Sequence, residues 1–475
     1  MKHLVFSLFV MVSAVAQAQT LRVTSGAMDE QVFQRDAAGI ANISLSGTAP
    51  GVDGKAVEAQ VSRKHVLLRD WAPAGKIAGG QWTAEIKALP AGGPYRIDLR
   101  VSGTAAIATV NNILVGDLWM LAGQSNMEGV GDLVNVEMPH ELVHSFDMTD
   151  QWIIAEEPLH TLPAAIDPVH QTIRKLPERL TGEKLRLFVS ARKKGAGLGL
   201  PFAVEMVRRT GVPVGLIPSA HGGTSMDQWD PALKSKGGHS LYGGMLRRFQ
   251  AAGSKITGVL WYQGESDANP KASPVFQDKF ERFVQLLRED FRQPDLPFYY
   301  VQIGRHVNTQ NLAEWNLVQE MQRKAESTIS HSGMAAAVDF SLDDGIHVST
   351  QDHKRLARRL ANLALGQAKR GPRPVSATFR DGIVRVEFAD VNGKLRSDGR
   401  LSGFSIHGAD GAPLPLIFKM RLDPADPNAA MLHIGGKLPE GAMLRYGFGK
   451  DPYCNLQDEL DMAAPVFGPM VISSI

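Results

Sequence analysis

The sequence predicts an α/β protein in which helices cover a central parallel sheet in a layered sandwich, with a β-rich domain at each end. Between residues 113 and 371, apolar runs alternate with long amphipathic stretches, which is typical of parallel strands joined by crossover helices. In residues 19–112 and 372–475, short runs such as "NISLSG" and "IVRVEFADV" alternate polar and apolar residues between Gly, Pro and Asp. That pattern is typical of antiparallel strands.

The bulk composition agrees with a globular protein of two or three domains. The chain has 475 residues, of which 44% are hydrophobic and 21% are charged. Its 51 basic and 49 acidic residues nearly cancel, and no basic patch stands out, so we expect no nucleic-acid partner. The single cysteine, Cys454, excludes an intrachain disulfide. The composition does not indicate an oligomeric state.

Residues 1–18 are predicted to be a signal peptide. Lys2 and His3 form a basic start, the stretch from Leu4 to Val15 is apolar, and Ala16-Gln17-Ala18 supplies the small residues that signal peptidase prefers. The apolar stretch is shorter than the roughly 20 residues needed to span a bilayer. An uncleaved anchor or a buried strand is the alternative. We therefore expect a periplasmic or secreted protein without stable membrane insertion.

Five strands are predicted in the central region: "ILVGDLWMLA", "VPVGLIPSA", "ITGVLWYQ", "PFYYVQIG" and "MAAAVDF". The clearest helix runs from Ser273 to Gln293, with four phenylalanines and Leu287 on one face and Pro294 directly after it. Ligands of open parallel sheets bind at the carboxyl ends of the strands. The informative residues should therefore directly follow each apolar run.

Four of these strands are followed by polar, glycine-rich stretches. The stretches are Gly123-Gln124-Ser125-Asn126-Met127, His221-Gly222-Gly223-Thr224-Ser225, Gln263-Gly264-Glu265-Ser266 and Asp343-Asp344-Gly345-Ile346-His347. They contain a serine, a glycine pair, a side-chain amide and an Asp/His pair. Together these are the components of acyl transfer.

Each component has a role in that chemistry. Ser125 is the candidate nucleophile, and it needs a base, for which His347 is the candidate. Asp344 can orient the imidazole and stabilise the imidazolium, with Asp343 as the rival acid. His221 is a less favoured second base, because it directly precedes a glycine turn.

A developing oxyanion needs hydrogen-bond donors. Backbone N–H groups of Ser125, Gly222 and Gly223 and the side-chain amide of Gln263 are predicted to supply them. Other side chains in and near the same stretches are predicted to bind substrate. These are Gln124, Asn126, His221, Trp229 and Glu265.

Each component also has a purely structural interpretation. Ser125 alone could cap a helix, the glycine pair could form a tight turn, and Gln263 could be a satisfied buried amide. Asp344 could cap a helix beginning near Thr350, and His347 could be a surface histidine. All of these at four strand ends would be an improbable coincidence, so the combination favours an enzyme. A non-catalytic glycan-binding protein, the alternative from another class, would need no Ser–His pairing.

Other enzyme classes fit less well. The nucleophile elbow of α/β-hydrolases requires Gly-x-Ser-x-Gly, and here the fifth residue is Met127. Glycines 195, 197 and 199 follow no predicted strand and lack the spacing of a dinucleotide fingerprint, so we expect a loop there. The 14 histidines include no HExxH pattern, so we expect neither a metal nor a cofactor.

The stretches "GQSNMEG", "HGGTSMDQW", "WYQGESDA" and "DDGIH" resemble the four sequence blocks of the SGNH hydrolases, and more narrowly their sialate O-acetylesterase branch of carbohydrate esterases. The resemblance implies Ser125 as nucleophile, Asp344 and His347 as its partners, and a block-two glycine at 222 or 223. The usual third-block asparagine is replaced by Gln263. It also implies a flavodoxin-like, three-layer catalytic domain.

We therefore expect a serine esterase that removes O-acetyl groups from sialic acid or an acetylated polysaccharide through an acyl-enzyme. A short-chain lipid or general esterase is the alternative. The segment 133–196, which carries Trp152 and the stretch "ARKK", lies between the first two blocks. We expect it to build one wall of the pocket and to determine substrate preference.

Overall fold

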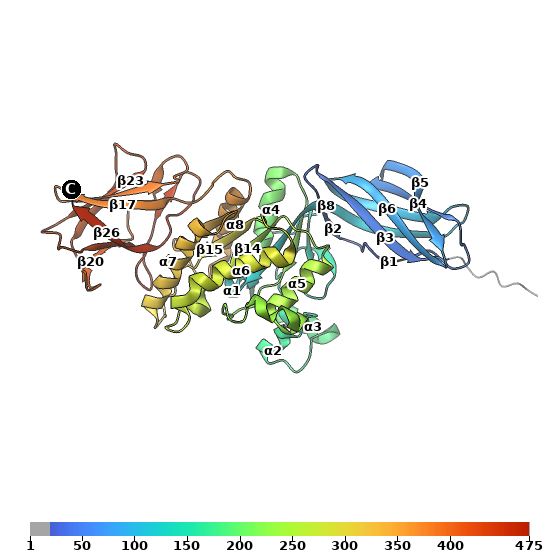
Figure 1. The fold of residues 1–475 in the computed structure, drawn as a ribbon, viewed down its shortest axis with the longest axis horizontal. Coiled ribbons are helices and arrows are strands. Elements are labelled where there is room, and N and C mark those ends of the chain that lie inside the picture. Colours follow the sequence, from blue (N-terminus) through green and yellow to red (C-terminus); the bar gives the residue numbers. More distant parts are fainter. Residues whose placement is uncertain (1–19, 475) are drawn as a thin grey trace, which may run out of the picture. The chain divides into compact units, whose positions relative to one another are not determined.

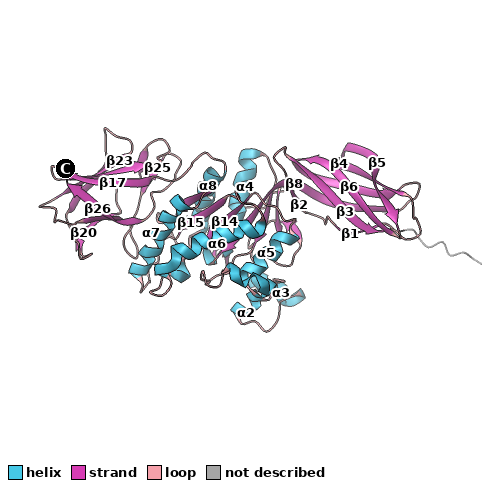
Figure 2. Cartoon of the chain, in the orientation of Figure 1, coloured by secondary structure: helices cyan, strands magenta, loops and turns pink. Residues whose placement is uncertain are grey.

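The computed structural model describes residues 20–474, so the predicted signal peptide lies outside the described residues. The chain forms two compact units (Figures 1 and 2). Of the described residues, the N-terminal unit comprises 20–29, 42–89 and 94–113. The main unit comprises 30–41, 90–93 and the chain from 114 onwards.

The N-terminal unit is built from antiparallel strands, as the alternating pattern predicts. They are β1 (Arg22–Ser25), β3 (Ile40–Thr48), β4 (Ala56–Arg63), β5 (Val66–Ala78), β6 (Gln81–Pro90), β7 (Gly92–Val101) and the first part of β8 (Ile107–Gly123). Along β3 and β6 nearly every second side chain is buried, so one face of each strand packs inward. This regularity explains why both strands could be recognised from the sequence.

A parallel sheet forms the centre of the main unit. Its strands are the second part of β8, then β10 (Val143–Phe146), β13 (Val214–Pro218), β14 (Gly258–Tyr262), β15 (Phe298–Gln302) and β16 (Ser332–Ala336), with β2 (Val32–Gln34) beside β8 and the antiparallel β11 (Trp152–Ile154) at one edge. The order is β11-β10-β13-β8-β14-β15-β16. All five predicted strands are present. The short β10 was not predicted.

Eight α-helices are described. They are α1 (Ser125–Glu128), α2 (Val169–Arg174), α3 (Gly182–Ala191), α4 (Gly199–Thr210), α5 (Leu241–Ala251), α6 (Phe276–Phe291), α7 (Leu312–Thr328) and α8 (Thr350–Ala364). Short 3-10 helices are η1 (Leu162–Ala164), η2 (Pro231–His239), η3 (Glu265–Asp267) and η4 (Ser273–Val275). The predicted helix after Ser273 is confirmed as η4 and α6, with its four phenylalanines and Leu287 buried. Helix α6 contacts both α5 and α7, and helix α4 contacts α8.

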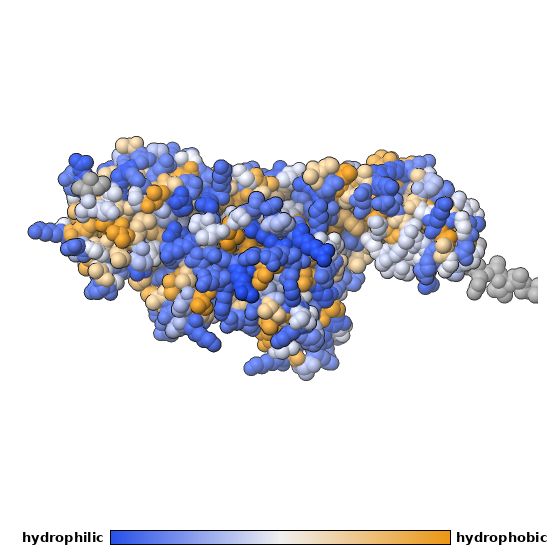
Figure 3. Space-filling view, in the orientation of Figure 1, coloured by the Kyte–Doolittle hydropathy of each residue, from blue (hydrophilic) through white to orange (hydrophobic). Residues whose placement is uncertain are grey.

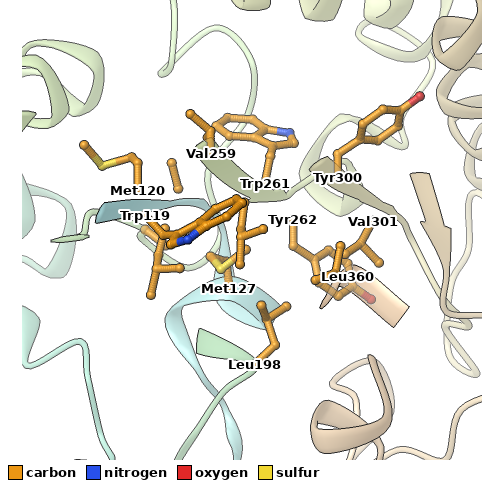
Figure 4. Close-up of a cluster of buried hydrophobic side chains, with 14 of the residues drawn as sticks. Trp119, Met120, Met127, Leu198, Val259, Trp261, Tyr262, Tyr300, Val301 and Leu360 are labelled. Carbon is orange, nitrogen blue, oxygen red and sulfur yellow. The ribbon is translucent and has the colours of Figure 1, made fainter. Parts of the chain in front are cut away.

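The core of the main unit lies between the sheet and these helices. Figure 4 shows the part around Trp119 of β8, with Val259 and Trp261 of β14 nearby. Trp119 packs edge-on against Phe202 of α4, with ring centroids 4.9 Å apart. Met127 of α1 is 1% exposed and belongs to the same cluster. The one-turn helix after β8 is therefore anchored in the core.

The region after α8 is β-rich, as the sequence predicts. Its strands are β17 (Arg373–Arg380), β18 (Ile383–Ala389), β19 (Leu395–Ser397), β20 (Phe404–His407), β21 (Pro413–Leu414), β22 (Ile417–Leu422), β23 (Ala429–Ile434), β24 (Met443–Tyr446), β25 (Leu456–Asp458) and β26 (Phe467–Ser474). Eight of them form one sheet in the order β21-β20-β24-β26-β17-β18-β23-β22. The region has a hydrophobic core of its own.

The compact units do not follow the predicted domain limits everywhere. Residues 30–41 and 90–93 belong to the main unit, and β2 joins its sheet by pairing with β8. The region after residue 372 belongs to the main unit as well. Buried polar contacts connect it: the amide of Gln302 bonds both backbone groups of Val466, and Arg359, which is 0% exposed, donates to the backbone oxygen of Asp461. Residue 372 therefore marks a change of secondary structure.

The surface on the side of α6 is largely hydrophilic, with hydrophobic residues in small separate patches (Figure 3). None of the helices within residues 20–474 is both long enough and apolar enough to cross a membrane.

Candidate active site

The nucleophile candidate is placed by the end of the central strand. β8 pairs with β13 on one side and β14 on the other, and it ends at Gly123. A Cβ at Gly123 would lie 2.2 Å from the backbone oxygen of Tyr262, and the residue has a φ of +131°. Only glycine fits this position. The chain then turns into α1, whose first residue is the half-buried Ser125.

Ser125 meets the Asp/His pair that follows β16. Nε2 of His347 lies 2.9 Å from Oγ of Ser125, and Nδ1 lies 2.8 Å from Oδ2 of Asp344. Partial burial would raise the pKa of Asp344, but hydrogen bonds from His347, from the N–H of Ile346 and from Lys194 hold it well below its ordinary value. A carboxylate, an imidazole and a hydroxyl are therefore connected in the order that a hydrolase triad requires.

Asp343, the rival acid, points elsewhere. Its Oδ2 accepts the backbone N–H of Asp132, at 2.8 Å, and that of Thr350, at 3.0 Å. It joins the stretch after the nucleophile, β9 (Gly131–Asp132), to the first residue of α8. The helix itself is capped by Ser349, whose side chain accepts from the N–H of Asp352. The geometry thus makes Asp344 the partner of His347.

The glycine pair lies against the nucleophile. A Cβ at Gly222 would come within 3.2 Å of Cβ of Ser125, so a side chain here would press against the nucleophile. The N–H of Gly222 donates to Oε2 of Glu128, at 2.7 Å. Within residues 20–474, the backbone N–H groups of Ser125 and Gly223 have no hydrogen-bond acceptor. Those two groups remain available to an oxyanion, whereas that of Gly222 is occupied.

Glu128 was not singled out from the sequence, although it stands in the stretch "GQSNMEG". Its Oε1 lies 2.5 Å from the guanidinium of Arg174, and its other oxygen accepts the N–H of Gly222. Burial raises the pKa of Glu128, and Arg174 and the Gly222 N–H act against that rise. A charged residue inside a run of amides and glycines was the available signal. Its partner on α2 could not be read from sequence spacing.

Gln124 and Asn126 fasten the nucleophile turn to two other strand ends. Oε1 of Gln124 accepts the N–H of Ser266, at 3.2 Å. The amide of Asn126 donates to Oε1 of Glu265, at 2.8 Å, and its oxygen accepts the N–H of Val348, at 3.0 Å. Gln124 and Glu265 line the cavity beside the nucleophile, and Asn126 does not. Burial raises the pKa of the Glu265 carboxyl.

The structure differs from the prediction at Gln263 and Trp229. The Gln263 amide, 0% exposed, donates to the backbone oxygen of Thr224 and to the carboxylate of Asp267, which leaves neither of its hydrogens for an oxyanion. Trp229, also 0% exposed, donates from Nε1 to Oγ1 of Thr224 and packs edge-on against Trp261. Neither residue lines the cavity. Both lie in the core under the block-two turn.

His221 lines the cavity from a buried histidine cluster. Its Nδ1 lies 2.9 Å from Nδ1 of His170, and the two rings are stacked. Burial lowers the pKa of His221, and that of the neighbouring His160, to about 3, and lowers that of His170 well below its ordinary value. His221 is bonded to His170 and not to Ser125. Of the two candidate bases, His347 is the one that is hydrogen-bonded to Ser125.

The cavity has a volume of about 890 Å³, and the segment 133–196 builds one of its walls. From this wall segment come Ile173, Arg174, Ala191, Arg192, Lys193 and Lys194. The stretch "ARKK" therefore lines the cavity. Trp152, also in the wall segment, packs in the core against Phe146, with ring centroids 5.4 Å apart.

No group of three or more His, Cys, Asp or Glu side chains within residues 20–474 is placed to hold a metal ion. The polar groups gathered at the strand ends are instead linked to one another in the order serine, histidine, aspartate.

A parallel sheet with a serine, a histidine and an aspartate linked in this order at its carboxyl end defines a hydrolase built on an α/β fold. The sequence model of one family, "Carbohydrate esterase, sialic acid-specific acetylesterase", matches residues 115–366, more than half of the chain. The protein belongs to this family. It is a carboxylic ester hydrolase.

Individual relatives agree with the family. A protein of Arabidopsis thaliana described as a probable carbohydrate esterase is 30% identical over 199 residues, which cover 39% of this chain and 68% of that protein. The sialate O-acetylesterase of Homo sapiens is 21% identical over 377 residues, 71% of this chain and 69% of that enzyme. The crystal structure of a carbohydrate acetylesterase from Xanthomonas citri superposes with a TM-score of 0.65 at 23% identity, covering 94% of this chain and 99% of that one. This last likeness extends the agreement in fold to nearly the whole chain.

Proposed function

We propose that the protein removes O-acetyl groups from carbohydrates by a serine acyl-enzyme mechanism. The observation that carries the proposal is the connection of Ser125 Oγ to His347 Nε2, at 2.9 Å, with Asp344 behind the imidazole at 2.8 Å. Membership of a carbohydrate esterase family supports the reaction class. A serine bonded to an oriented imidazole is the arrangement that activates a hydroxyl as a nucleophile.

In the first half of the reaction, Oγ of Ser125 attacks the acetyl carbonyl while Nε2 of His347 takes its proton. Asp344 stabilises the resulting imidazolium. The backbone N–H groups of Ser125 and Gly223 bind the oxyanion of the tetrahedral intermediate. The carbon–oxygen bond to the sugar then breaks, and the imidazolium returns its proton to the sugar oxygen. Acetyl-Ser125 remains.

In the second half, His347 takes a proton from water, and the hydroxide attacks the acetyl carbon. A second tetrahedral intermediate forms. Its collapse breaks the bond between the acetyl carbon and Oγ of Ser125, and Oγ takes a proton back from the imidazolium. Acetate is released and Ser125 is regenerated. Each half uses the same hydrogen-bonded Ser125–His347 pair, so no other group has to move a proton.

The substrate proposed is an acetylated acidic sugar of the sialic acid type. The cavity beside Ser125 has four basic lining residues, all in the wall segment, against two buried lining carboxylates, Glu128 and Glu265. An excess of positive charge favours a ligand that carries a carboxylate. The human relative's name, sialate O-acetylesterase, agrees with this choice.

Two further parts of the proposal concern architecture and location. The separate contact groups α5-α6-α7 and α4-α8 support helices on both faces of the sheet, as in a three-layer flavodoxin-like domain. The strand order β13-β8-β14-β15-β16 is also that of flavodoxin-like sheets. The basic start and apolar stretch within residues 1–18 support export to the periplasm or medium.

The test measures acetate released from O-acetylated sialic acid and from acetylated xylan by the wild type and by Ser125→Ala. We expect release from the sialic acid, and a loss of about 10³-fold or more in Ser125→Ala with unchanged circular dichroism. An aryl ester series should be cleaved in the order acetate, butyrate, octanoate, since each methylene that does not fit costs about 1–3 kcal/mol in discrimination.

Each contrary outcome would exclude the proposed mechanism or point to a different function. Near-normal turnover by Ser125→Ala would exclude the mechanism. A preference that rises towards octanoate, without acetate from either glycan, would indicate a lipid esterase. Binding of the glycan without hydrolysis would indicate a glycan-binding protein.

A further inference from the structure

The triad acid has a second charged partner besides His347. Nζ of Lys194 lies 3.0 Å from Oδ2 of Asp344, and this is the same oxygen that lies 2.8 Å from Nδ1 of His347. Lys194 also donates to the backbone oxygen of Asp343, at 3.2 Å, and lies 3.6 Å from Oδ1 of Asp132. One ammonium group therefore connects the triad acid, its chain neighbour and β9.

A short two-stranded ribbon brings Lys194 to this place. β12 (Lys194–Ala196) pairs antiparallel with β9, and Lys194 stands opposite Asp132 in that register. The ribbon lies close to the nucleophile turn because of glycine: a Cβ at Gly129 would lie 2.5 Å from the backbone oxygen of Gly195, and Gly129 has a φ of +95°. Backbone pairing thus determines where the wall segment delivers its ammonium group.

We propose that Lys194 is a positioning residue that holds Asp344 against His347 and sets the lower pH limit of the esterase. This inference rests on the proposed function, because it concerns the same triad. The positive charge beside Asp344 partly cancels the negative field that stabilises an imidazolium at His347. The imidazole then stays neutral, and able to accept the serine proton, to a lower pH than it would beside an unshared carboxylate.

Other charged or titratable groups near the pair do not duplicate this role. They are the carboxylates of Asp132, Asp343 and Glu265, the rings of His306 and His353, and Lys450 beyond His306. Burial lowers the pKa of His306, and it lowers that of His353 to about 4, so both rings are neutral near pH 7. Within residues 20–474, Lys194 is the lysine or arginine that forms an ion pair with Asp344.

The pKa directions of the two partners agree with the contact. Burial acts against the charge on Lys194, but the hydrogen bond and charge of Asp344 raise its pKa above the ordinary value. Asp344 has its pKa lowered, as described above. Both groups therefore carry their charges throughout the range in which an imidazole titrates. The contact is present wherever the pH limit would be measured.

The test is the pH dependence of kcat/KM for an aryl acetate, measured from about pH 5 to about pH 9 across the titration range of imidazole. In Lys194→Met, the midpoint of the acid limb should rise by about 0.5–1 pH unit, a size limited by solvent screening of a side chain that is 38% exposed. The plateau value of kcat/KM should fall several-fold because Asp344 loses the ion pair that helps to hold it against His347. Lys194→Gln keeps a donor without the charge, so it should show the same shift with a plateau closer to the wild type.

Two matched variants separate the effect of the Lys194–Asp344 contact from the effect of losing any ion pair or any cation in the cavity. Lys234→Met breaks a comparable ion pair, with Nζ of Lys234 2.6 Å from Oδ1 of Asp290, outside the cavity lining, and should leave the profile unchanged. Lys193→Met removes a cation that lines the same cavity and has no ion-pair partner within residues 20–474. Its shift should be less than half of that seen in Lys194→Met.

The inference fails if the acid limbs of Lys194→Met and Lys194→Gln coincide with that of the wild type while activity still requires Ser125. An equal shift in Lys193→Met would also overturn it, because the effect would then belong to the cavity's overall charge. Absence of any Ser125-dependent acetate release in the wild type would instead refute the proposed function. If Lys194→Met does not fold, the midpoint of Lys194→Gln decides alone.

Discussion

The backbone N–H of Gly222 donates to the carboxylate of Glu128 at a distance of 2.7 Å. Gly222 lies against Ser125, and Glu128 is the last residue of the one-turn helix that Ser125 begins. The hydrogen bond therefore connects the nucleophile's own helix to the turn beside it. The oxyanion donor proposed at Gly223 is the next residue along that turn.

Glu128→Ala should lower kcat by about 10–100-fold with little change in KM, because a small displacement of the turn affects the transition state most. Glu128→Gln keeps an acceptor for the Gly222 N–H and should stay within a few-fold of the wild type. Steady-state kinetics on an aryl acetate measures both variants. Equal losses in both would instead assign the effect to the ion pair with Arg174.

Asp344→Asn and Asp343→Asn should differ strongly. Asp344→Asn should lose about 10⁴-fold in kcat, since the imidazole loses the carboxylate that orients it. Asp343→Asn keeps an oxygen that can accept the N–H groups of Asp132 and Thr350, so its kcat should stay within about tenfold of the wild type. A larger kcat loss in Asp343→Asn than in Asp344→Asn would reverse the assignment.

Gln263→Ala should reduce stability more than turnover. Its amide satisfies the buried carboxylate of Asp267 and the backbone oxygen of Thr224, and each acceptor left without a donor costs about 1–3 kcal/mol. Urea unfolding and kcat should be measured on one preparation. A loss of about 10²–10³-fold in kcat at unchanged stability would restore Gln263 as an oxyanion donor.

The buried histidine cluster should make the protein sensitive to acid. His160 and His221 have pKa values lowered to about 3 by burial, so the folded state keeps both neutral while the unfolded chain binds protons below about pH 6.5. Their contribution is therefore fully present above that pH and is lost as the pH falls, by about 1.4 kcal/mol per pH unit for each ring.

The measurement compares the free energy of unfolding at about pH 7 and about pH 5, on either side of the imidazole titration. In His160→Gln, the difference between the two values should shrink by about 2 kcal/mol, because glutamine does not titrate in this range. Any general cost of the substitution cancels in the comparison. An unchanged difference would contradict the prediction, because it would mean that folding leaves the pKa of His160 at its unfolded value.

The strands and α6 could be predicted because their signals are local. A run of apolar residues, or phenylalanines at helical spacing such as those at 276, 280, 283 and 291, is present in the sequence before any folding. β10 carries no such signal: it has four residues, two of them polar, and becomes a strand by pairing with β13, some seventy residues further on. Its place depends on a partner that sequence spacing does not reveal.

The residues of the candidate site also divide into those that a local sequence signal predicts and those whose contacts depend on the folded chain. Ser125, Asp344 and His347 could be identified because each follows a recognisable strand. Sequence spacing does not show side-chain direction, so the sequence predicts Trp229 in the pocket, whereas its indole donates to Thr224 inside the core. The contacts of Lys194 were missed because they arise only when the wall segment folds back along β9.

The polar contacts that cross residue 372 have a practical consequence for protein engineering. A fragment cut there would keep the whole triad but lose the groups that satisfy its interior: Gln302 would lose both partners on Val466, and Arg359 would lose its acceptor on Asp461. Arg359 would keep its ion pair with Asp339, but the fragment would leave one guanidinium N–H and the Gln302 amide oxygen without these partners at its cut edge. The β-rich tail is therefore unsuited to exchange as a cassette between related enzymes, and chimaeras should place their junctions elsewhere.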